Sequence, residues 1–272
     1  MIQGEVLEHQ LAKFRASHPA RRLAHRGKDW RYYAAGQSGE AVLLLGGALG
    51  LAEFAFQQIR LLELHFRVLA PDYPPVPSLA ELTDGLLALL DTEHIRTAHV
   101  VGGSFGGLLA QVLVRRAPKR VASLVLSHTG APDRRRRSAA QRVVALLPAP
   151  LLRATLKARL GRTLAATDPF WRRYFEGAVS RLSRADILSR IRLQAEFSAE
   201  AGYCPEDLTA WPGRILVIEA ADDPLFPPAA QQRLRALYPL AQVHQFQGTG
   251  HAAALLRPEE YAAVLTRFFG MP

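Results

Sequence analysis

Residues 97–117 read TAHVVGGSFGGLLAQVLVRRA, a short apolar run that enters a Gly-rich turn and leaves it as an amphipathic segment. The apolar run predicts a buried strand, and the segment after the turn predicts a helix. Within the turn, Gly102, Ser104 and Gly106 fit the pattern G-x-S-x-G, which places a serine on a tight strand-to-helix bend. The two glycines remove a collision between the arms of the bend. We therefore interpret Ser104 as a nucleophile whose hydroxyl projects above the edge of a sheet.

The same turn has two rival interpretations. One is a plain strand-to-helix turn without chemistry, since G-x-S-x-G alone is a weak pattern. The other is a dinucleotide-binding loop, because Gly102-x-Ser104-x-x-Gly107 is one substitution away from G-x-G-x-x-G. Against the second, the central glycine is serine, the turn follows a late strand, and no acidic residue stands about 20 residues further on.

Short apolar runs alternate with amphipathic segments on both sides of this turn. The expected strands are 30–35, 41–45, 66–70, 97–101, 121–127, 214–218 and 241–246. The expected helices are 51–65, 79–90, 105–117, 228–237 and 258–269. This rhythm predicts an α/β protein with a mostly parallel sheet and helices on both faces.

The rhythm is interrupted from residue 133 to residue 209, where only helical segments are expected. The candidates are 138–147, 151–160, 170–182 and 184–199. The simplest organisation is one core domain, residues 1–132 and 210–272, with a helical insertion at residues 133–209.

An acidic pair and a histidine follow the last two expected strands. Asp222 and Asp223 come after strand 214–218, and His251 comes after strand 241–246. Because the carboxyl ends of parallel strands meet at one edge of a sheet, these side chains can approach Ser104. A histidine there would take the serine proton as a general base, and a carboxylate would fix the imidazole tautomer.

Acyl transfer also needs two backbone donors for the oxyanion. We expect the N–H of Phe105, directly after the serine, and the N–H of Ala48, in the Gly-rich loop that follows strand 41–45. The candidate substrate-contacting residues are Gly47, Tyr73 and His128. Each of these also has a purely structural interpretation, as a turn or packing residue.

Composition narrows the class further. The chain has 272 residues, of which 49% are hydrophobic, and Cys204 is its single cysteine, so it forms no internal disulfide. No metal-ligand spacing is visible, and neither a metal nor a cofactor is expected. The N-terminal sequence has no apolar run of signal-peptide length, and no stretch approaches a membrane span. These features predict a cytoplasmic protein with a small-molecule substrate.

The net charge of +10 is concentrated in one segment. Residues 133–200 contain 15 Lys and Arg against six Asp and Glu. The simpler interpretation is a solvated outer face of the insertion helices. The alternative is attraction of an anionic substrate or surface, with Arg134–Arg137 as the best candidate patch. No nucleic-acid recognition motif accompanies the charge, so nucleic acid is not expected.

These residues together resemble the α/β-hydrolase superfamily over nearly the whole chain. The matching stretches are LLLGGALG (43–50), GGSFGG (102–107), ILVIEAADDPLFP (215–227) and GTGH (248–251). The resemblance implies a Ser104–His251–Asp223 triad, since Asp223 keeps the family's position four residues before Pro227. Asp222 would then brace the loop. The sequence departs from the family where Gly46 replaces a usual histidine and Ala220 a usual glycine.

Within that superfamily, the chain is similar to maspardin-like proteins. The similar segments are FRASHPARRL (14–23), WRYYAAG (30–36), FRVLAPDYPPV (66–76) and GGSFGGLLAQ (102–111). The insertion resembles the helical lid of other superfamily members. The resemblance implies a carboxylesterase-like serine hydrolase that cleaves an ester, thioester or lactone of a small to medium, partly apolar substrate. Two alternatives stay open: carbon–carbon bond hydrolysis or perhydrolysis by the same triad, and a non-catalytic scaffold with a protein partner.

Overall fold

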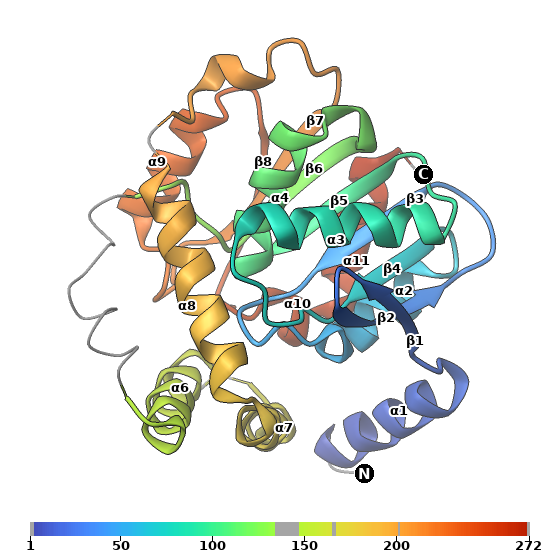
Figure 1. Cartoon of the computed structure of the whole chain (residues 1–272), viewed down its shortest axis with the longest axis vertical. Coiled ribbons are helices and arrows are strands. Elements are labelled where there is room, and N and C mark those ends of the chain that lie inside the picture. Colours follow the sequence, from blue (N-terminus) through green and yellow to red (C-terminus); the bar gives the residue numbers. More distant parts are fainter. Residues whose placement is uncertain (1–2, 134–146, 165–166, 201, 271–272) are drawn as a thin grey trace.

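The computed structural model describes residues 3–133, 147–164, 167–200 and 202–270. Its centre is an eight-stranded sheet in the order β1-β2-β4-β3-β5-β6-β7-β8 (Figure 1). The strands are β1 (Arg21–His25), β2 (Lys28–Ala35), β3 (Ala41–Leu45), β4 (Arg67–Pro71), β5 (Ala98–Gly103), β6 (Val121–Ser127), β7 (Arg214–Ala220) and β8 (Gln242–Phe246). From β4 to β8 all neighbours are parallel, while β1, β2 and β4 pair antiparallel. The expected mostly parallel sheet is confirmed.

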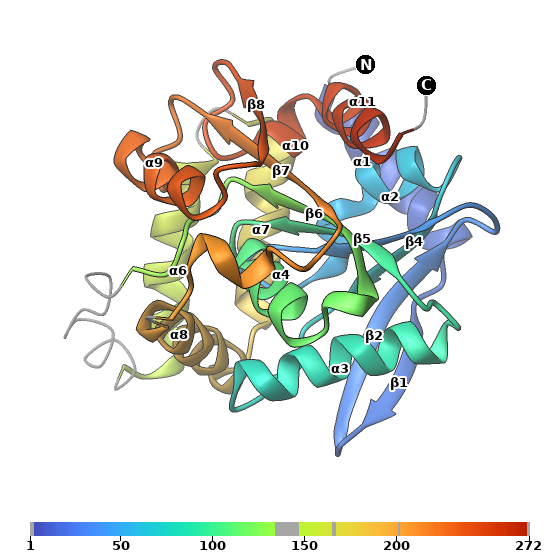
Figure 2. The same ribbon diagram turned by 90° about the horizontal axis from the view of Figure 1, so that it is seen from above.

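Helices cover both faces of the sheet, as Figure 2 shows. On one face lie α3 (Leu79–Thr92), α4 (Phe105–Arg116) and α9 (Pro228–Leu237), and on the other lie α1 (Gln3–Ser17), α2 (Phe56–Leu62), α10 (Ala253–Leu256) and α11 (Pro258–Phe269). Successive side chains of a strand point to opposite faces. Accordingly, Leu43 and Leu45 of β3 pack in the layer of α3 and α4, while Val42 and Leu44 pack in the layer of α2 and α11.

Two parts of the N-terminal third differ from the expectation. The sequence did not predict the helix α1 or the strand β1. The helix was missed because it carries few apolar residues. Tertiary contacts explain α1, since Phe14 is fully buried with its ring 5.0 Å from Tyr33 and 6.0 Å from Phe56. The helix expected at 51–65 begins instead as a 3₁₀ turn, η1 (Ala52–Ala55), and becomes α2 only at Phe56.

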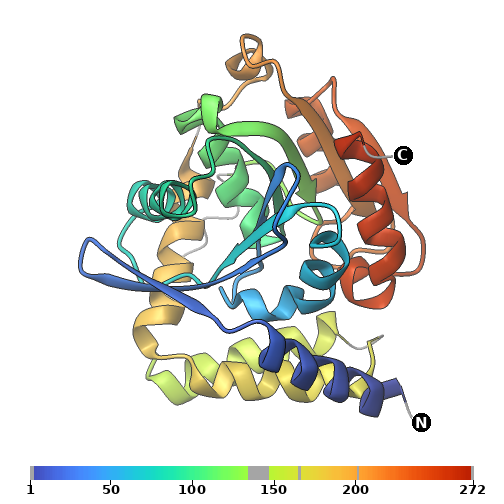
Figure 3. The same cartoon turned by 90° about the vertical axis from the view of Figure 1, so that its right-hand side faces the viewer.

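A helical insertion between β6 and β7 is confirmed. We use this name for α6 (Ala149–Thr163), α7 (Pro169–Arg181) and α8 (Arg184–Ala199). Its own small core, which includes Leu152, Val179 and Ile187, packs against Leu49 of the loop after β3. In Figure 3, α1 lies beside the insertion helices, and α1 contacts α7. The expected helix at 138–147 and the Arg134–Arg137 patch fall outside the described residues.

Candidate active site

Ser104 lies at the bend between β5 and α4, with φ of 53° and ψ of −114°. A non-glycine residue rarely adopts a positive φ, so the bend is held in a strained conformation. The two flanking glycines are required by contact: a Cβ on Gly102 would lie 2.4 Å from the Gly106 carbonyl oxygen, and one on Gly106 would lie 2.0 Å from the Leu45 oxygen. The Thr129 hydroxyl donates to the Ser104 carbonyl at 2.8 Å.

The glycine-rich loop after β3 faces this serine. A Cβ added to Gly47 would lie 3.9 Å from the Ser104 Cβ. Ala48 and Phe105, the two expected oxyanion donors, line the same cavity as Ser104. Phe105 is the first residue of α4, so its N–H has no acceptor within the helix. The positive end of the helix dipole points in the same direction.

His251 follows β8 and meets the acid loop that follows β7. Its Nδ1 lies 2.8 Å from Asp223 Oδ2, and its ring stacks on Phe226 with centroids 5.7 Å apart. Because Nδ1 faces the carboxylate, Nε2 is the nitrogen left to face a reacting group. The structure therefore brings together the imidazole and the carboxylate that the sequence paired.

The two neighbouring aspartates have different partners. Asp223 is buried, and its second oxygen, Oδ1, accepts the backbone N–H of Leu225 at 2.8 Å and of Phe226 at 3.2 Å. Asp222 instead accepts the N–H of Gly250 at 3.0 Å, which ties the acid loop to the histidine loop. Burial alone would raise the pKa of Asp223, but the hydrogen bond and the charge of His251 hold that pKa below its usual value. Asp223 is therefore the carboxylate that orients the ring.

His128 follows β6 and lies edge-on to His251, with ring centroids 5.7 Å apart. Its Nδ1 lies 3.0 Å from the Ser127 hydroxyl, and its Nε2 is buried. Burial, followed by the neighbouring His251, lowers the pKa of His128 to about 4. The ring is therefore neutral at physiological pH and lines the cavity as an uncharged polar group.

A cavity of about 310 Å³ joins these parts. Ser104, Gly47, Ala48, Phe105, His128 and His251 all line it. The insertion contributes an apolar wall, formed by Leu156, Leu160, Leu164, Phe175 and Phe197. Among the described residues, no Asp, Glu, Lys or Arg side chain lines the cavity. The hydroxyl of Ser104 makes no hydrogen bond to His251 in the described conformation, and such contacts commonly tighten only when substrate binds.

Not every expected site residue lies in the cavity. Tyr73 is buried outside it, with its hydroxyl donating to the Gly46 carbonyl at 3.1 Å. Conversely, Phe226, Gln58 and Tyr261 line the cavity but were not expected there. Phe226 could have been found from its place in the acid loop, whereas nothing in the local sequence marks the other two. A larger cleft of about 1100 Å³, near the starts of β6 and β7, contains none of the expected site residues.

The fold and this site define the class of protein. Residues 41–264 match the profile of the Alpha/beta hydrolase family, and the chain belongs to that family. None of the described helices is both long enough and apolar enough to span a bilayer. Within the same described ranges, no group of His, Cys, Asp and Glu side chains could hold a metal ion.

Several of the proteins to which the chain is similar have names that refer to different activities. A putative carbamate hydrolase, RutD, of Caulobacter vibrioides is 28% identical, over 84% of this chain and 90% of the relative. Maspardin of Danio rerio is 26% identical, over 91% of this chain and 81% of maspardin. A 2-hydroxymuconate semialdehyde hydrolase of Pseudomonas putida is 28% identical, over 82% of this chain and 81% of the relative. Among solved structures, an enol-lactonase from Burkholderia xenovorans LB400 superposes with a TM-score of 0.77 at 20% identity, covering 92% of this chain and 99% of that one.

Proposed function

We propose that the protein is a serine hydrolase that cleaves an ester, thioester or lactone of a small to medium, partly apolar substrate. The observation that carries the proposal is the Asp223–His251 pair, 2.8 Å apart, opening onto the cavity that Ser104 also lines. Residues 133–209 would act as a lid that shapes the substrate pocket. The apolar wall from α6, α7 and α8 supports that assignment.

In the proposed reaction, Ser104 Oγ attacks the carbonyl carbon while His251 Nε2 takes the hydroxyl proton. The carbonyl oxygen becomes an oxyanion held by the N–H groups of Phe105 and Ala48. Collapse of this intermediate breaks the bond to the leaving group, which receives its proton from His251. Water then attacks the acyl-serine, with His251 again as the base, and Ser104 is released. Asp223 stabilises the imidazolium in both halves.

The described lining of the cavity holds no charged side chain, which supports a neutral substrate over an anionic one. A buried carboxylate without a cationic partner is strongly disfavoured. A muconate derivative is anionic, and the described cavity offers it no Arg or Lys. On these described contacts we place carbon–carbon bond hydrolysis behind ester cleavage, while perhydrolysis by the same triad stays an alternative. The similarity to maspardin keeps a non-catalytic scaffold as the remaining alternative.

A fluorophosphonate probe separates an activated serine from a scaffold. We expect covalent labelling of the wild-type protein and none of Ser104→Ala. We expect Asp223→Asn to lower kcat for p-nitrophenyl esters by about a thousandfold or more, as loss of a triad carboxylate does elsewhere. Asp222→Asn, the matched control, keeps most of kcat because the amide oxygen of asparagine can still accept the N–H of Gly250. Folded wild-type protein that resists the probe would contradict the proposal.

A further inference from the structure

The loop that carries Ala48 is held at three points by two consecutive residues. The Tyr73 hydroxyl donates to the Gly46 carbonyl at 3.1 Å, and the Tyr73 N–H donates to the Gly50 carbonyl at 2.8 Å. Asp72 Oδ1 accepts the Ala52 N–H at 2.7 Å. Both ends of the loop are therefore fixed, while the residues between them face Ser104.

We call Asp72 and Tyr73 the clamp. Their contacts matter because the loop contains three glycines, which leave the backbone with unusual conformational freedom. An oxyanion donor should lie roughly 2.7 to 3.1 Å from the oxygen, which is a range of only about 0.4 Å. A misplacement of about 1 Å can lower the rate of an enzyme by about a hundredfold. Within the loop, the Gly50 N–H donates to the Gly47 carbonyl at 2.9 Å across Ala48, so contacts from outside the loop set where this turn, and with it the Ala48 N–H, lies.

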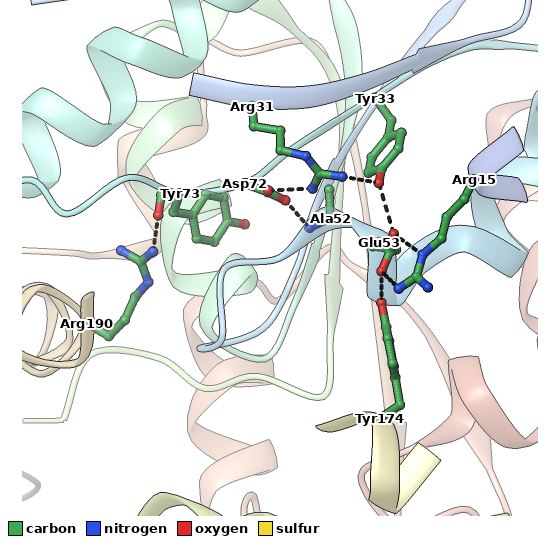
Figure 4. A network of polar contacts seen from close by, with 9 residues as sticks. All are labelled: Arg15, Arg31, Tyr33, Ala52, Glu53, Asp72, Tyr73, Tyr174 and Arg190. Carbon is green, nitrogen blue, oxygen red and sulfur yellow. Dashed lines mark hydrogen bonds and ion pairs between the residues drawn. The ribbon is translucent and has the colours of Figure 1, made fainter. Parts of the chain in front are cut away.

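Arg190 of α8 holds the clamp from the side of the insertion. Its Nη2 donates to the Tyr73 carbonyl, its Nη1 donates to the Pro74 carbonyl at 3.4 Å, and its guanidinium lies 5.3 Å from the centre of the Tyr73 ring. Figure 4 shows Arg190 reaching Tyr73, with Asp72 beside it. The side chain is buried, which lowers its pKa to about 10, and its hydrogen bonds go to carbonyls rather than to a carboxylate. Burial of a cation without a carboxylate partner costs free energy. The Arg190 side chain is therefore held in this position by its specific contacts.

Gly50 closes the contact between the clamp and the loop. It has φ of +62°, and an added Cβ would lie 2.6 Å from Arg190 Nη2 and 2.9 Å from Tyr73 Cδ2. Only a residue without a side chain lets the loop lie directly on this pair. The insertion, the tyrosine and the oxyanion loop are thus packed as one unit.

The Asp72 side of the clamp is anchored in the same manner. Arg31 Nη1 donates to Asp72 Oδ2 at 2.8 Å, and Arg31 also bonds the Tyr33 hydroxyl. Tyr33 and Tyr174 of α7 both donate to Glu53, which follows the loop (Figure 4). A second helix of the insertion is therefore connected to the far end of the loop.

We propose that Tyr73, held by Arg190, is a positioning residue that sets the place of the Ala48 N–H in the oxyanion hole. The inference rests on the proposed function. It assigns Tyr73 to the alignment of backbone around the transition state and not to contact with substrate. It also makes α8 a part of the catalytic geometry, because Arg190 is the link between that helix and the loop.

The test is Tyr73→Phe, which keeps the ring and removes only the hydroxyl that bonds Gly46. We expect kcat for p-nitrophenyl esters to fall about tenfold while KM changes by less than about twofold, since the lost alignment acts in the transition state. The rate of fluorophosphonate labelling falls by the same factor. Tyr32→Phe is the matched control, because its hydroxyl donates to Glu93, which does not contact the loop. This variant keeps the wild-type constants.

Arg190 provides a second, graded test. Arg190→Lys retains the charge and can reach one carbonyl, so we expect a smaller fall in kcat than for Arg190→Met. Unchanged kcat and labelling rate in Tyr73→Phe would overturn the inference while leaving the proposed function intact. A loss of thermal stability in Tyr73→Phe, with KM and kcat altered together, would also overturn it. Absence of labelling in the wild-type protein would instead remove the proposed function, and the inference with it.

Discussion

Neighbouring residues in this site differ in role because their surroundings differ. Asp222 and Asp223 each carry a carboxylate. The carboxylate of Asp222 joins two loops through Gly250, whereas that of Asp223 faces the imidazole of His251. The order of residues along the chain predicted that Ser104, His251 and the acid loop lie at one edge of the sheet, because parallel strands bring their ends together. It could not show that the Tyr73 hydroxyl turns toward Gly46 and away from the cavity. Side-chain direction at a strand end depends on packing from distant segments, here Arg190.

At the same scale, the burial of His128 predicts how the stability of the protein depends on pH. Its pKa of about 4 lies below the usual 6.5 of histidine, so the unfolded chain binds more protons between these two pH values. The resulting stability is fully present above pH 6.5 and is lost as the pH falls toward 4. A shift of this size corresponds to about 3 kcal/mol.

Urea unfolding at pH 7 and pH 4.5 measures this effect. We expect the free energy of unfolding to fall less in His128→Asn than in the wild-type protein over this interval. The amide does not titrate, so the difference between the two proteins isolates the histidine. Equal losses in both proteins would show that His128 is not buried in its neutral form.

At the scale of elements, the alternation of apolar runs predicted seven strands and most helices, because each buries a face with a clear period. It did not predict α1, whose few apolar residues are buried by contacts with elements distant in sequence, among them β2, α2 and α7. It also extended one helix back to residue 51, where the chain forms a 3₁₀ turn tied to Asp72 through Ala52. In both places contacts distant in sequence decide the local structure.

The bend at Ser104 gives an element-scale prediction. A Cβ on Gly106 would lie 2.0 Å from the Leu45 carbonyl oxygen, a backbone atom that cannot move without displacing β3. We expect Gly106→Ala to lower the free energy of unfolding by about 3 kcal/mol or more.

Gly161→Ala is the matched control for that substitution. Among the residues that the structure describes, its added Cβ meets nothing within 4 Å, and the position lies inside α6. We expect this variant to gain about 0.5–1 kcal/mol from helix propensity. Thermal denaturation of the two variants compares them directly, and similar stability of both would contradict the packing of the bend.

At the scale of the molecule, and over the residues that the structure describes, positively charged side chains do not line the cavity. The exposed arginines of α7, Arg172, Arg173 and Arg181, lie at the surface, while the described lining of the cavity is uncharged. The basic composition of the insertion therefore reflects the solvent-exposed face of its helices more than the charge of its substrate. The sequence alone could not make this distinction, because it depends on which way each helix is turned.

This separation predicts selectivity between two esters of equal length. We expect kcat/KM for p-nitrophenyl butyrate to exceed that for the mono-p-nitrophenyl ester of succinate by about a hundredfold or more. Against the described lining, the second ester must bury a carboxylate without a cation, which costs several kcal/mol. Steady-state kinetics at two ionic strengths separates the cavity from long-range attraction by the surface. A preference for the charged ester would show that a cation reaches the substrate.

The sheet order has a consequence for synthesis of the chain. Ser104 and the glycine-rich loop belong to the first half, while Asp223 and His251 follow β7 and β8, more than a hundred residues later. A ribosome would thus expose the serine and the segments that hold its oxyanion well before any base exists to activate it. The proposed enzyme would stay inert until the segment that carries His251 had been made.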